Sequence, residues 1–251
     1  MRQLKQLKTK KGRDETGLFI VEGEKFVSEI PPQWHITRYV ATERFAASRD
    51  LSMYKNRAPI EVIKDSQFDS ISDTVTPQGI LAICKQTFWS IADLLTHAKP
   101  NGFLLFGEHL NDPGNIGALV RTVAAAGACG MILSKNSGEL YNPKVVRAAA
   151  GALLRLPIVT DVDAHETIAA LRDAGYATYA AHLHGDVLPY GLNLKNKFCF
   201  LVGNESHGLS PKTATLADAW VRLPMAGEVE SLNASVAGSI LLYEAVRQRL
   251  S

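Results

Sequence analysis

The stretch FCFLVGNESHGL, residues 198–209, joins an uninterrupted apolar run to a glycine-containing loop. A continuous apolar run is typical of a strand buried on both faces of a parallel sheet. Three similar runs occupy residues 103–106, 131–133 and 178–181. Helical stretches are expected between and after these strands, at residues 116–126, 144–154, 165–174 and 234–250. This alternation predicts an α/β fold with a mostly parallel sheet covered by helices.

The residues before 102 predict a separate, smaller α/β domain. Its strands are expected at residues 18–21, 37–41, 60–63 and 80–85, and its helices at 22–30 and 67–72. Residues 86–101 form a plausible connector with a short helix at 91–97. We therefore expect a first domain at residues 1–88, a linker at 89–101 and a second domain at 102–251.

Composition argues against several classes of protein. The chain has 251 residues, of which 46% are hydrophobic and 21% charged, so a disordered chain is not expected. No apolar run approaches the roughly 18–20 residues that span a bilayer, and residues 1–13 lack the apolar core of a secretory signal. The scattered cysteines, Cys84, Cys129 and Cys199, argue against a disulfide scaffold or a zinc site. We expect a reducing, cytoplasmic setting.

The N-terminal segment is basic. Residues 1–13 hold six cations and no acid, whereas the remaining 238 residues carry 21 cations against 25 acids. This asymmetry favours contact with a polyanion, most simply nucleic acid. A solvated, frayed terminus is an equally good explanation at this point.

Three loops at the expected carboxyl edge of the sheet carry the unusual polar residues, and ligands of open α/β sheets bind at that edge. The loops are GEHLNDPGNIG at residues 107–117, the glycine-rich turn at 203–208, and the segment at 223–235. A helix cap would explain Ser231 or Asn233 singly, but not three such loops. The helix that follows the first loop carries Arg121, and an arginine one turn inside a helix can face the loop before it.

Several common signatures are missing from the sequence. There is no phosphate-binding G-x-x-x-x-G-K-[ST] loop, no G-x-S-x-G nucleophile elbow, no H-E-x-x-H zinc motif and no G-x-G-x-x-G after a strand. His182 and His184 are expected on the same side of a strand. Two ordinary strand histidines explain this pair more simply than a metal site does, so we expect no metal.

Three ordered motifs resemble those of the SpoU/TrmH RNA ribose 2′-O-methyltransferases of the SPOUT superfamily. They are Asn115-x-x-x-x-x-Arg121, LVGNESHGL at residues 201–209, and LPMAGEVESLNASVAGSILLYEA at residues 223–245. The segment RDETGLFIVEGEKFVSEI at residues 13–30 resembles the RNA-binding domain that precedes the catalytic domain in many ribosomal-RNA-modifying members. Two departures are mild: Asn204 and His207 occupy variable positions, and Ala234 stands where valine is common.

The resemblance implies a deep C-terminal trefoil knot whose loops hold S-adenosylmethionine, mainly through backbone groups. It also implies a homodimer in which the partner chain helps to complete each acceptor site. The positions that match the family's cofactor contacts are Gly203, Leu223 and Leu232, with Met225 close by.

The resemblance further implies that Arg121 prepares the ribose hydroxyl for attack. A free guanidinium stays protonated, so we interpret Arg121 as a phosphate clamp and a hydroxyl-orienting group, and leave the proton acceptor open. The sulfonium of the cofactor already activates the methyl group, so no metal is needed. Asn115, Glu205, Ser231 and Asn233 match the other polar positions of the family site.

The sequence thus predicts transfer of a methyl group from S-adenosylmethionine to a ribose 2′-hydroxyl of structured RNA. Ribosomal RNA is favoured over transfer RNA because of the N-terminal domain. A transfer RNA methyltransferase, a ribosomal RNA methyltransferase that confers antibiotic resistance, and a non-catalytic RNA-binding relative remain alternatives. Residues 1–88 are expected to supply most of the RNA affinity, with the cations of residues 1–13 on phosphates, and their deletion is expected to leave a folded, dimeric, cofactor-binding core.

Overall fold

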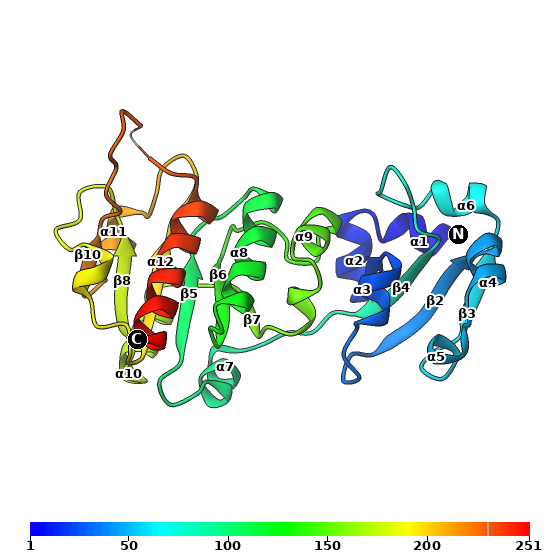
Figure 1. Ribbon diagram of the computed structural model, residues 1–251, viewed down its shortest axis with the longest axis horizontal. Helices are drawn as coiled ribbons and strands as arrows, with labels where there is room; N and C mark the ends of the chain where they lie inside the picture. The colour runs from blue at the N-terminus through cyan, green and yellow to red at the C-terminus, as the bar shows by residue number, and fades with distance from the viewer. Residues whose placement is uncertain (230) are drawn as a thin grey trace. The chain divides into compact units, whose positions relative to one another are not determined.

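The computed structural model describes residues 1–229 and 231–251, without the side chain of Arg2. Its internal contacts divide the chain into two compact units. Unit 1 comprises Met1–Thr87 and Glu139–Leu154, and unit 2 comprises Phe88–Gly138 and Arg155–Ser251 (Figure 1). This division differs in one segment from the two consecutive domains that the sequence predicts. Glu139–Leu154 comes from the middle of the expected second domain, yet it packs with unit 1.

Unit 1 is built on a mixed four-stranded sheet in the order β1-β4-β2-β3. β4 lies antiparallel to β1 and β2, whereas β3 lies parallel to β2. The four strands expected from the sequence are confirmed to within one residue at each end. They are β1 (Leu18–Glu22), β2 (Ile36–Thr42), β3 (Ile60–Ile63) and β4 (Ile80–Lys85). The helices of unit 1 are α1 (Arg2–Gln6), α2 (Lys10–Thr16), α3 (Glu24–Ser28), α4 (Glu43–Ser48), α5 (Ser52–Lys55), α6 (Asp65–Asp69), α9 (Pro143–Ala148) and the short 3-10 helix η1 (Ala152–Leu154).

The N-terminal segment is folded, so the frayed-terminus alternative is wrong. Leu4 and Leu7 are fully buried in a cluster with Val40 and Phe68. Arg13 is also buried, and its guanidinium pairs with Glu139. Arg13 is therefore not available for an RNA phosphate, contrary to the expectation that all six cations of this segment make such contacts.

The segment Glu139–Leu154 forms part of the core of unit 1. The Tyr141 ring lies with its centroid 4.5 Å from that of Phe19 on β1, and Trp34 Nε1 donates to the Leu154 carbonyl at 2.7 Å. The continuous helix predicted over residues 144–154 is wrong. The chain breaks between α9 and η1, because Ala150 and Gly151 adopt φ values of 49° and 81° in the left-handed region.

Unit 2 is built on a six-stranded sheet in the order β10-β8-β9-β5-β6-β7, with every pair parallel. The predicted parallel sheet is confirmed. The two strands that the sequence analysis missed, β7 and β10, are the edge strands, whose half-exposed residues interrupt the apolar pattern. The strands are β5 (Phe103–Gly107), β6 (Gly130–Ser134), β7 (Ile158–Val162), β8 (Ala177–Ala181), β9 (Phe198–Val202) and β10 (Ala219–Val221).

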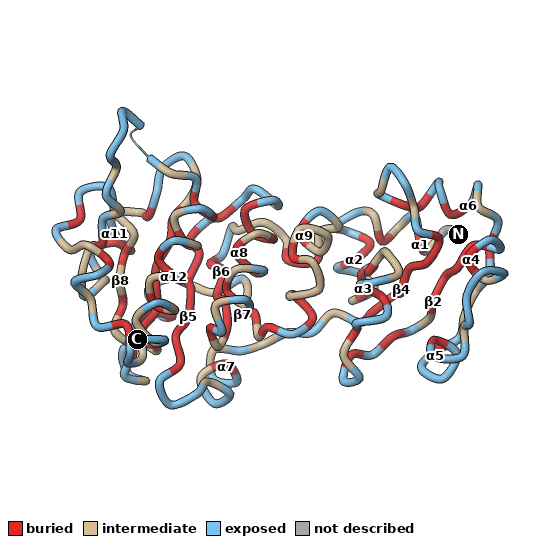
Figure 2. Tube along the Cα trace, in the orientation of Figure 1, coloured by how far each residue is buried: buried red, intermediate tan, exposed pale blue. Residues whose placement is uncertain are grey.

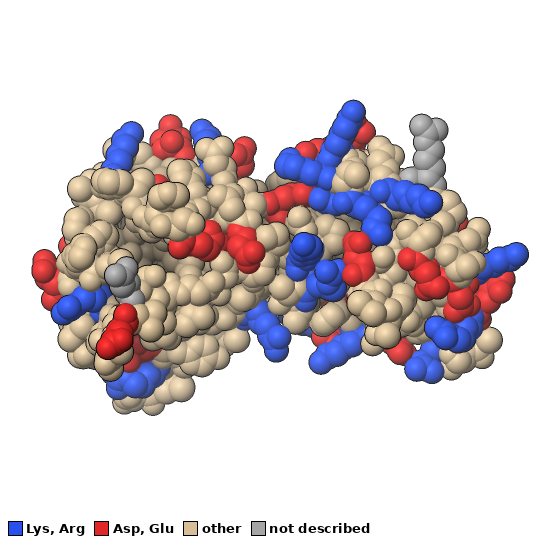
Figure 3. Space-filling view, turned by 90° about the horizontal axis from the view of Figure 1, so that it is seen from above, with Lys and Arg blue, Asp and Glu red and all other residues tan. Residues whose placement is uncertain are grey.

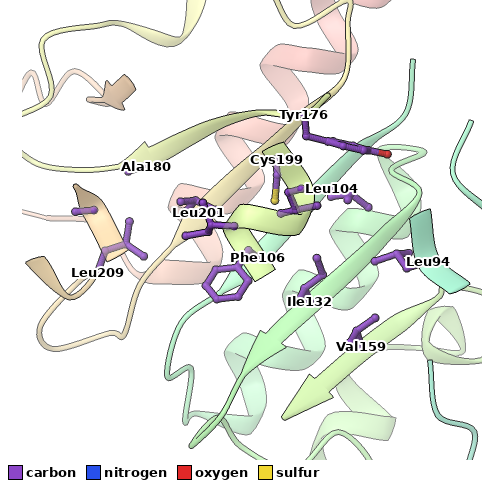
Figure 4. Close-up of a cluster of buried hydrophobic side chains, with 13 residues drawn as sticks. Leu94, Leu104, Phe106, Ile132, Val159, Tyr176, Ala180, Cys199, Leu201 and Leu209 are labelled. Atoms are coloured by element: carbon purple, nitrogen blue, oxygen red, sulfur yellow. The ribbon is translucent and has the colours of Figure 1, made fainter. Parts of the chain in front are cut away.

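Helices cover both faces of this sheet, and Figure 2 shows that burial concentrates on the strands. On one face, Leu104, Phe106 and Leu201 pack in a cluster with Leu94 and Ile168 (Figure 4). The opposite face carries two helices that lie side by side, α8 and α12. No helix in residues 1–229 or 231–251 is long and apolar enough to cross a membrane. The helices of unit 2 are α7 (Ile91–His97), α8 (Pro113–Ala125), α10 (Ala164–Asp173), η2 (Pro189–Gly191), α11 (Pro211–Ala214) and α12 (Ala234–Leu250).

Candidate active site

Two helix N-termini meet at the carboxyl edge of the sheet in unit 2. Asp112 caps α8, because its carboxylate accepts the backbone N–H of Asn115 at 2.8 Å. Asn233 caps α12, because its Oδ1 accepts the backbone N–H groups of Ser235 at 2.8 Å and Val236 at 3.3 Å. Since α8 and α12 pack side by side, these caps place Asn115 and Asn233 next to each other.

Asn115 is the centre of a hydrogen-bonded network. Its Nδ2 donates to Glu205 Oε1 at 3.0 Å. Its Oδ1 accepts from Asn233 Nδ2 at 2.9 Å and from Ser235 Oγ at 3.2 Å. The Asn115 side chain is buried and both ends of its amide are used, so its orientation is fixed. The structure thus brings together Asn115 of α8, Glu205 of the turn after β9 and Asn233 at the start of α12.

Glu205 projects from a tight turn that requires glycine at residue 203. The backbone N–H groups of Asn204 and Gly208 each donate to the other residue's carbonyl, at 3.0 Å and 2.9 Å. A Cβ atom on Gly203 would lie 2.0 Å from the Gly208 carbonyl carbon, so any side chain there would displace the turn. Glycine is therefore required at residue 203 by the packing of this turn on itself, whether or not a ligand approaches it.

Two polar residues that the sequence analysis missed support the site. Ser235 joins the network through Asn115 and Asn233, and its place in the first turn of α12 is a signal that could have found it. Glu108 is buried at the end of β5 and accepts hydrogen bonds from Ser210 N at 2.7 Å, Ser210 Oγ at 2.9 Å and the Thr213 hydroxyl. Glu108 therefore ties the loop after β5 to the start of α11.

Arg121 and Ser231 lie outside this network. Both are exposed, and neither has a hydrogen-bond or ion-pair partner in the part of the chain that the structure describes. The expectation that Arg121 lies one turn inside its helix is wrong, because α8 begins at Pro113 and not at residue 116. Arg121 is six residues after Asn115, which places it about 9 Å further along the axis and about 120° around it.

The backbone of Leu223–Val229 is open to a ligand. This segment belongs to no helix or strand, and none of its N–H or C=O groups bonds to another group of the described chain. Leu223, Met225 and Leu232 are half-buried. Figure 3, seen from the side of these loops, shows a hollow in unit 2 that is surrounded mostly by uncharged atoms. Free backbone groups beside apolar side chains fit a cofactor that is held through the main chain.

The two histidines singled out in the sequence do not form a strand pair. β8 ends at Ala181, so His182 and His184 follow the strand, with ring centroids 5.8 Å apart. The ring of His182 lies 4.2 Å from that of Trp220, and burial lowers the pKa of His182. The described residues contain no group of three or more side chains that could hold a metal ion.

Two family models match the chain. The SpoU rRNA methylase family matches residues 102–243, and the MRM3-like substrate-binding domain matches residues 1–82. The first match contains the whole Asn115–Glu205–Asn233 network, and the second contains all four strands of unit 1 except the end of β4.

Named relatives and a solved structure agree with these matches. The chain is 32% identical to the 23S rRNA (guanosine-2′-O-)-methyltransferase RlmB of Xylella fastidiosa, over 86% of this chain and 90% of that protein. It is 28% identical to the 23S rRNA (guanosine(2553)-2′-O)-methyltransferase RlmP of Bacillus subtilis, over 95% and 92%. The AdoMet-bound rRNA methyltransferase from Sinorhizobium meliloti superposes with a TM-score of 0.90 at 30% identity, over 100% of this chain and 95% of that one. This chain therefore belongs to the SpoU rRNA methylase family.

Proposed function

We propose that this protein transfers the methyl group of S-adenosylmethionine to a ribose 2′-hydroxyl of ribosomal RNA in the cytoplasm. The observation that carries the proposal is the network in which the two capped helix N-termini and the Glu205 turn fix Asn115. The named relatives modify 23S rRNA at ribose 2′-oxygens, and the bound cofactor supplies an activated methyl group as a sulfonium.

The residues of this chain divide the task between donor and acceptor. The free backbone groups of Leu223–Val229, with Leu232 and the Gly203 turn, hold the cofactor. The rigid Asn115–Glu205–Asn233 network forms the polar wall beside it. Arg121 clamps an RNA phosphate and orients the 2′-hydroxyl, which is a role of position and charge that needs no deprotonated guanidinium. Ser231 is exposed at the rim, where an RNA group can reach it.

The placement of Arg121 supports a homodimer as the active species. Arg121 lies too far around α8 to face the Asn115 network of its own chain. On α12, Val236, Ile240 and Tyr243 are 45%, 45% and 53% exposed, at the i, i+4 and i+7 positions of one face. A second copy that covers this apolar face brings its own Arg121 toward the network. Each acceptor site is then built from both chains.

The same proposal includes a trefoil knot in unit 2. In that arrangement the C-terminal segment of the chain threads through a loop. The superposition over the whole chain on a solved methyltransferase of the same family supports this topology. A knot explains how loops after β9 and β10 and the start of α12 stay together around one cofactor.

Unit 1 supplies most of the RNA affinity in this proposal. Lys5, Lys10 and Lys11 are exposed, and the latter two form exposed pairs with Asp14 and Glu15 that contribute little to stability. Figure 3 shows that Lys and Arg side chains gather on the visible face of unit 1. Backbone phosphates of folded RNA fit such a face, and these contacts position RNA without reading its sequence.

The test compares 2′-O-methyl positions in total RNA from cells with and without the protein. We expect one ribosomal RNA position to lose its methyl group. A lost transfer RNA position would contradict the assignment to ribosomal RNA, and an unchanged pattern would contradict the enzymatic function.

A variant tests the role of Arg121 with purified protein. Arg121→Ala is expected to lower turnover by on the order of 10²-fold or more while cofactor affinity, measured by calorimetry, stays unchanged. Arg172→Ala on α10 is the control, because Arg172 is an exposed arginine of the same unit on the opposite face of the sheet. A variant at Arg121 that keeps more than about a third of wild-type turnover is incompatible with the role.

A further inference from the structure

A second hollow lies at the carboxyl edge of unit 2, beside the candidate active site. It has a volume of about 590 Å³ and is open to solvent. Its walls come from the loops that follow β5, β6 and β7 and from the start of α11. None of the Asn115–Glu205–Asn233 network and none of the four cofactor positions lines it. The hollow is therefore distinct from the methyl-transfer site, although both occupy the edge where ligands of parallel sheets bind.

The lysines of this hollow are exposed, whereas its two carboxylates, Glu108 and Asp163, are buried and half-buried. Lys135, Lys212, His109 and His165 line it, and all four are exposed. In the part of the chain that the structure describes, neither lysine ammonium has a carboxylate partner within ion-pair distance. Two ammonium groups at one small hollow attract an anion, and lysine binds phosphate as a point charge.

The two carboxylates of the hollow are already engaged. Glu108 is buried and accepts three hydrogen bonds from Ser210 and Thr213. Asp163 caps α10 by accepting the backbone N–H groups of His165 and Glu166, at 2.9 Å and 3.2 Å. Hydrogen bonds from those N–H groups lower the pKa of Asp163, and the charges of Lys135 and Lys212 lower it further. Both lysine charges therefore act on Asp163 within the same hollow, while the oxygens of the two acids are already used as hydrogen-bond acceptors.

His109 joins the hollow to the turn that carries Glu205. The His109 carbonyl accepts a hydrogen bond from Asn204 Nδ2 at 2.8 Å, and Asn204 immediately precedes Glu205. The His109 N–H donates to Ser134 Oγ at 2.9 Å, and Ser134 belongs to the wall of the hollow. An RNA strand that places one ribose against the Glu205 loop thus has a neighbouring nucleotide within reach of the hollow.

We propose that this hollow binds a backbone phosphate of the acceptor RNA, next to the nucleotide that is methylated, through Lys135 and Lys212. The inference rests on the proposed function, since it assigns a subsite for the same RNA. A phosphate contact sets the register of a strand without reading a base. The hollow therefore adds affinity for a strand whose neighbouring ribose lies at the methyl-transfer site.

The test uses the full chain, an unmodified 23S rRNA transcript and two matched double variants. Lys135→Ala/Lys212→Ala removes the proposed contacts. Lys99→Ala/Lys195→Ala removes the same charge from exposed lysines that precede β5 and β9, at the amino edge of the same sheet. We expect the first variant to raise the KM for RNA by about tenfold, with kcat within about twofold, because the affinity for RNA falls while the reacting groups stay in place.

The salt dependence of RNA binding gives a second measurement. The slope of log affinity against log salt should flatten by roughly 0.7–0.9 for each phosphate contact that Lys135→Ala/Lys212→Ala loses. The affinity for S-adenosylmethionine and the melting temperature should match those of the control. Lys135→Arg/Lys212→Arg keeps the charge and should bind RNA as the wild type does.

Two results separate this inference from the proposed function. If Lys135→Ala/Lys212→Ala and the amino-edge control show the same RNA affinity and salt slope, the hollow does not bind the RNA backbone, whatever the wild type methylates. If the wild type transfers no methyl group to the transcript, the proposed function fails, and the binding measurements still decide whether RNA contacts the hollow.

Discussion

Replacing Arg13 by alanine should destabilise unit 1 selectively. The Arg13 side chain is 3% exposed, and it makes two bonds to the Glu139 carboxylate, with Nε–Oε1 and Nη2–Oε2 distances of 2.5 Å. Its Nη1 also donates to the Leu7 carbonyl at 2.7 Å. The pair fastens α2 to the segment Glu139–Leu154, which reaches unit 1 from the far part of the sequence.

The expected cost follows from burial. Removing one partner of a buried ion pair destabilises a protein by about 3–5 kcal/mol, because the other charge is left without a partner. Glu139 is 16% exposed and can regain some water, so the lower limit of about 3 kcal/mol applies to Arg13→Ala. At about 1.4 kcal/mol for each factor of ten, the open form of unit 1 becomes on the order of 10²-fold more populated.

Two buried cysteines report on the units separately. Cys84 lies on β4 in unit 1, and burial raises the pKa of its thiol to about 12. Cys199 lies on β9 in unit 2, where burial also raises the thiol pKa. Thiolate is the reactive form, so both should react with an alkylating reagent only after opening. Mass spectrometry of labelled Arg13→Ala should show Cys84 reacting about 10²-fold faster and Cys199 at its wild-type rate.

The control is a second arginine of unit 1 with the same bonding pattern at the surface. Arg49 also makes two bonds to one carboxylate, that of Glu24, but both partners are exposed. Arg49→Ala should therefore leave Cys84 labelling unchanged. The reasoning is refuted if Arg13→Ala labels Cys84 within about threefold of the wild-type rate, or if Cys199 accelerates equally.

Three further outcomes test unit 2. Gly203→Ala should abolish S-adenosylmethionine binding in calorimetry, because its Cβ would fall 2.0 Å from backbone atoms, whereas Gly191→Ala, whose Cβ would lie 3.9 Å from the Val187 side chain, should bind normally. Asn115→Asp should lower methyl transfer at least about tenfold, since a carboxylate replaces the amide that donates to Glu205 at 3.0 Å; wild-type turnover would contradict this role. Ile240→Glu should yield a monomer in light scattering and no turnover, because it charges the exposed face of α12; an active monomer would overturn the shared site.

The sequence predicted the buried central strands better than the edge strands and the N-terminal helices. Strands such as β5 and β9 are apolar throughout because helices cover both faces of the sheet, so their composition reveals them. The edge strand β10 spans only three residues and lacks that pattern. α1 and α2 were missed because six cations dominate the segment, although Leu4 and Leu7 have the i, i+3 spacing of a helix face.

The sequence predicted which residues form the site, but not how their side chains are arranged. The motif resemblance selected Asn115, Glu205 and Asn233, and the structure places both Glu205 and Asn233 within hydrogen-bond distance of Asn115. The position of Arg121 depends on where α8 begins. Asp112 followed by Pro113 is an N-cap followed by proline at the first helical position, a signal that would have moved the helix start and separated Arg121 from the network.

The packing of Glu139–Leu154 changes the expected result of a truncation. From the sequence, a protein without residues 1–88 should keep a folded core. In the structure, that deletion removes the partners of the buried side chains Leu140, Tyr141, Val145 and Leu154, which belong to unit 1. Each buried side chain of this size contributes about 1.5–3 kcal/mol, so their joint exposure approaches the whole stability of a domain, about 5–15 kcal/mol.

We therefore expect the protein that lacks residues 1–88 to aggregate or to expose Cys199 to labelling. A second truncated protein, in which a short glycine–serine linker also replaces residues 139–154, should stay soluble and protect Cys199, because it keeps all six strands of unit 2. If the simple truncation is as soluble and as protected as this second protein, Glu139–Leu154 does not need unit 1, and the two expected domains are independent after all.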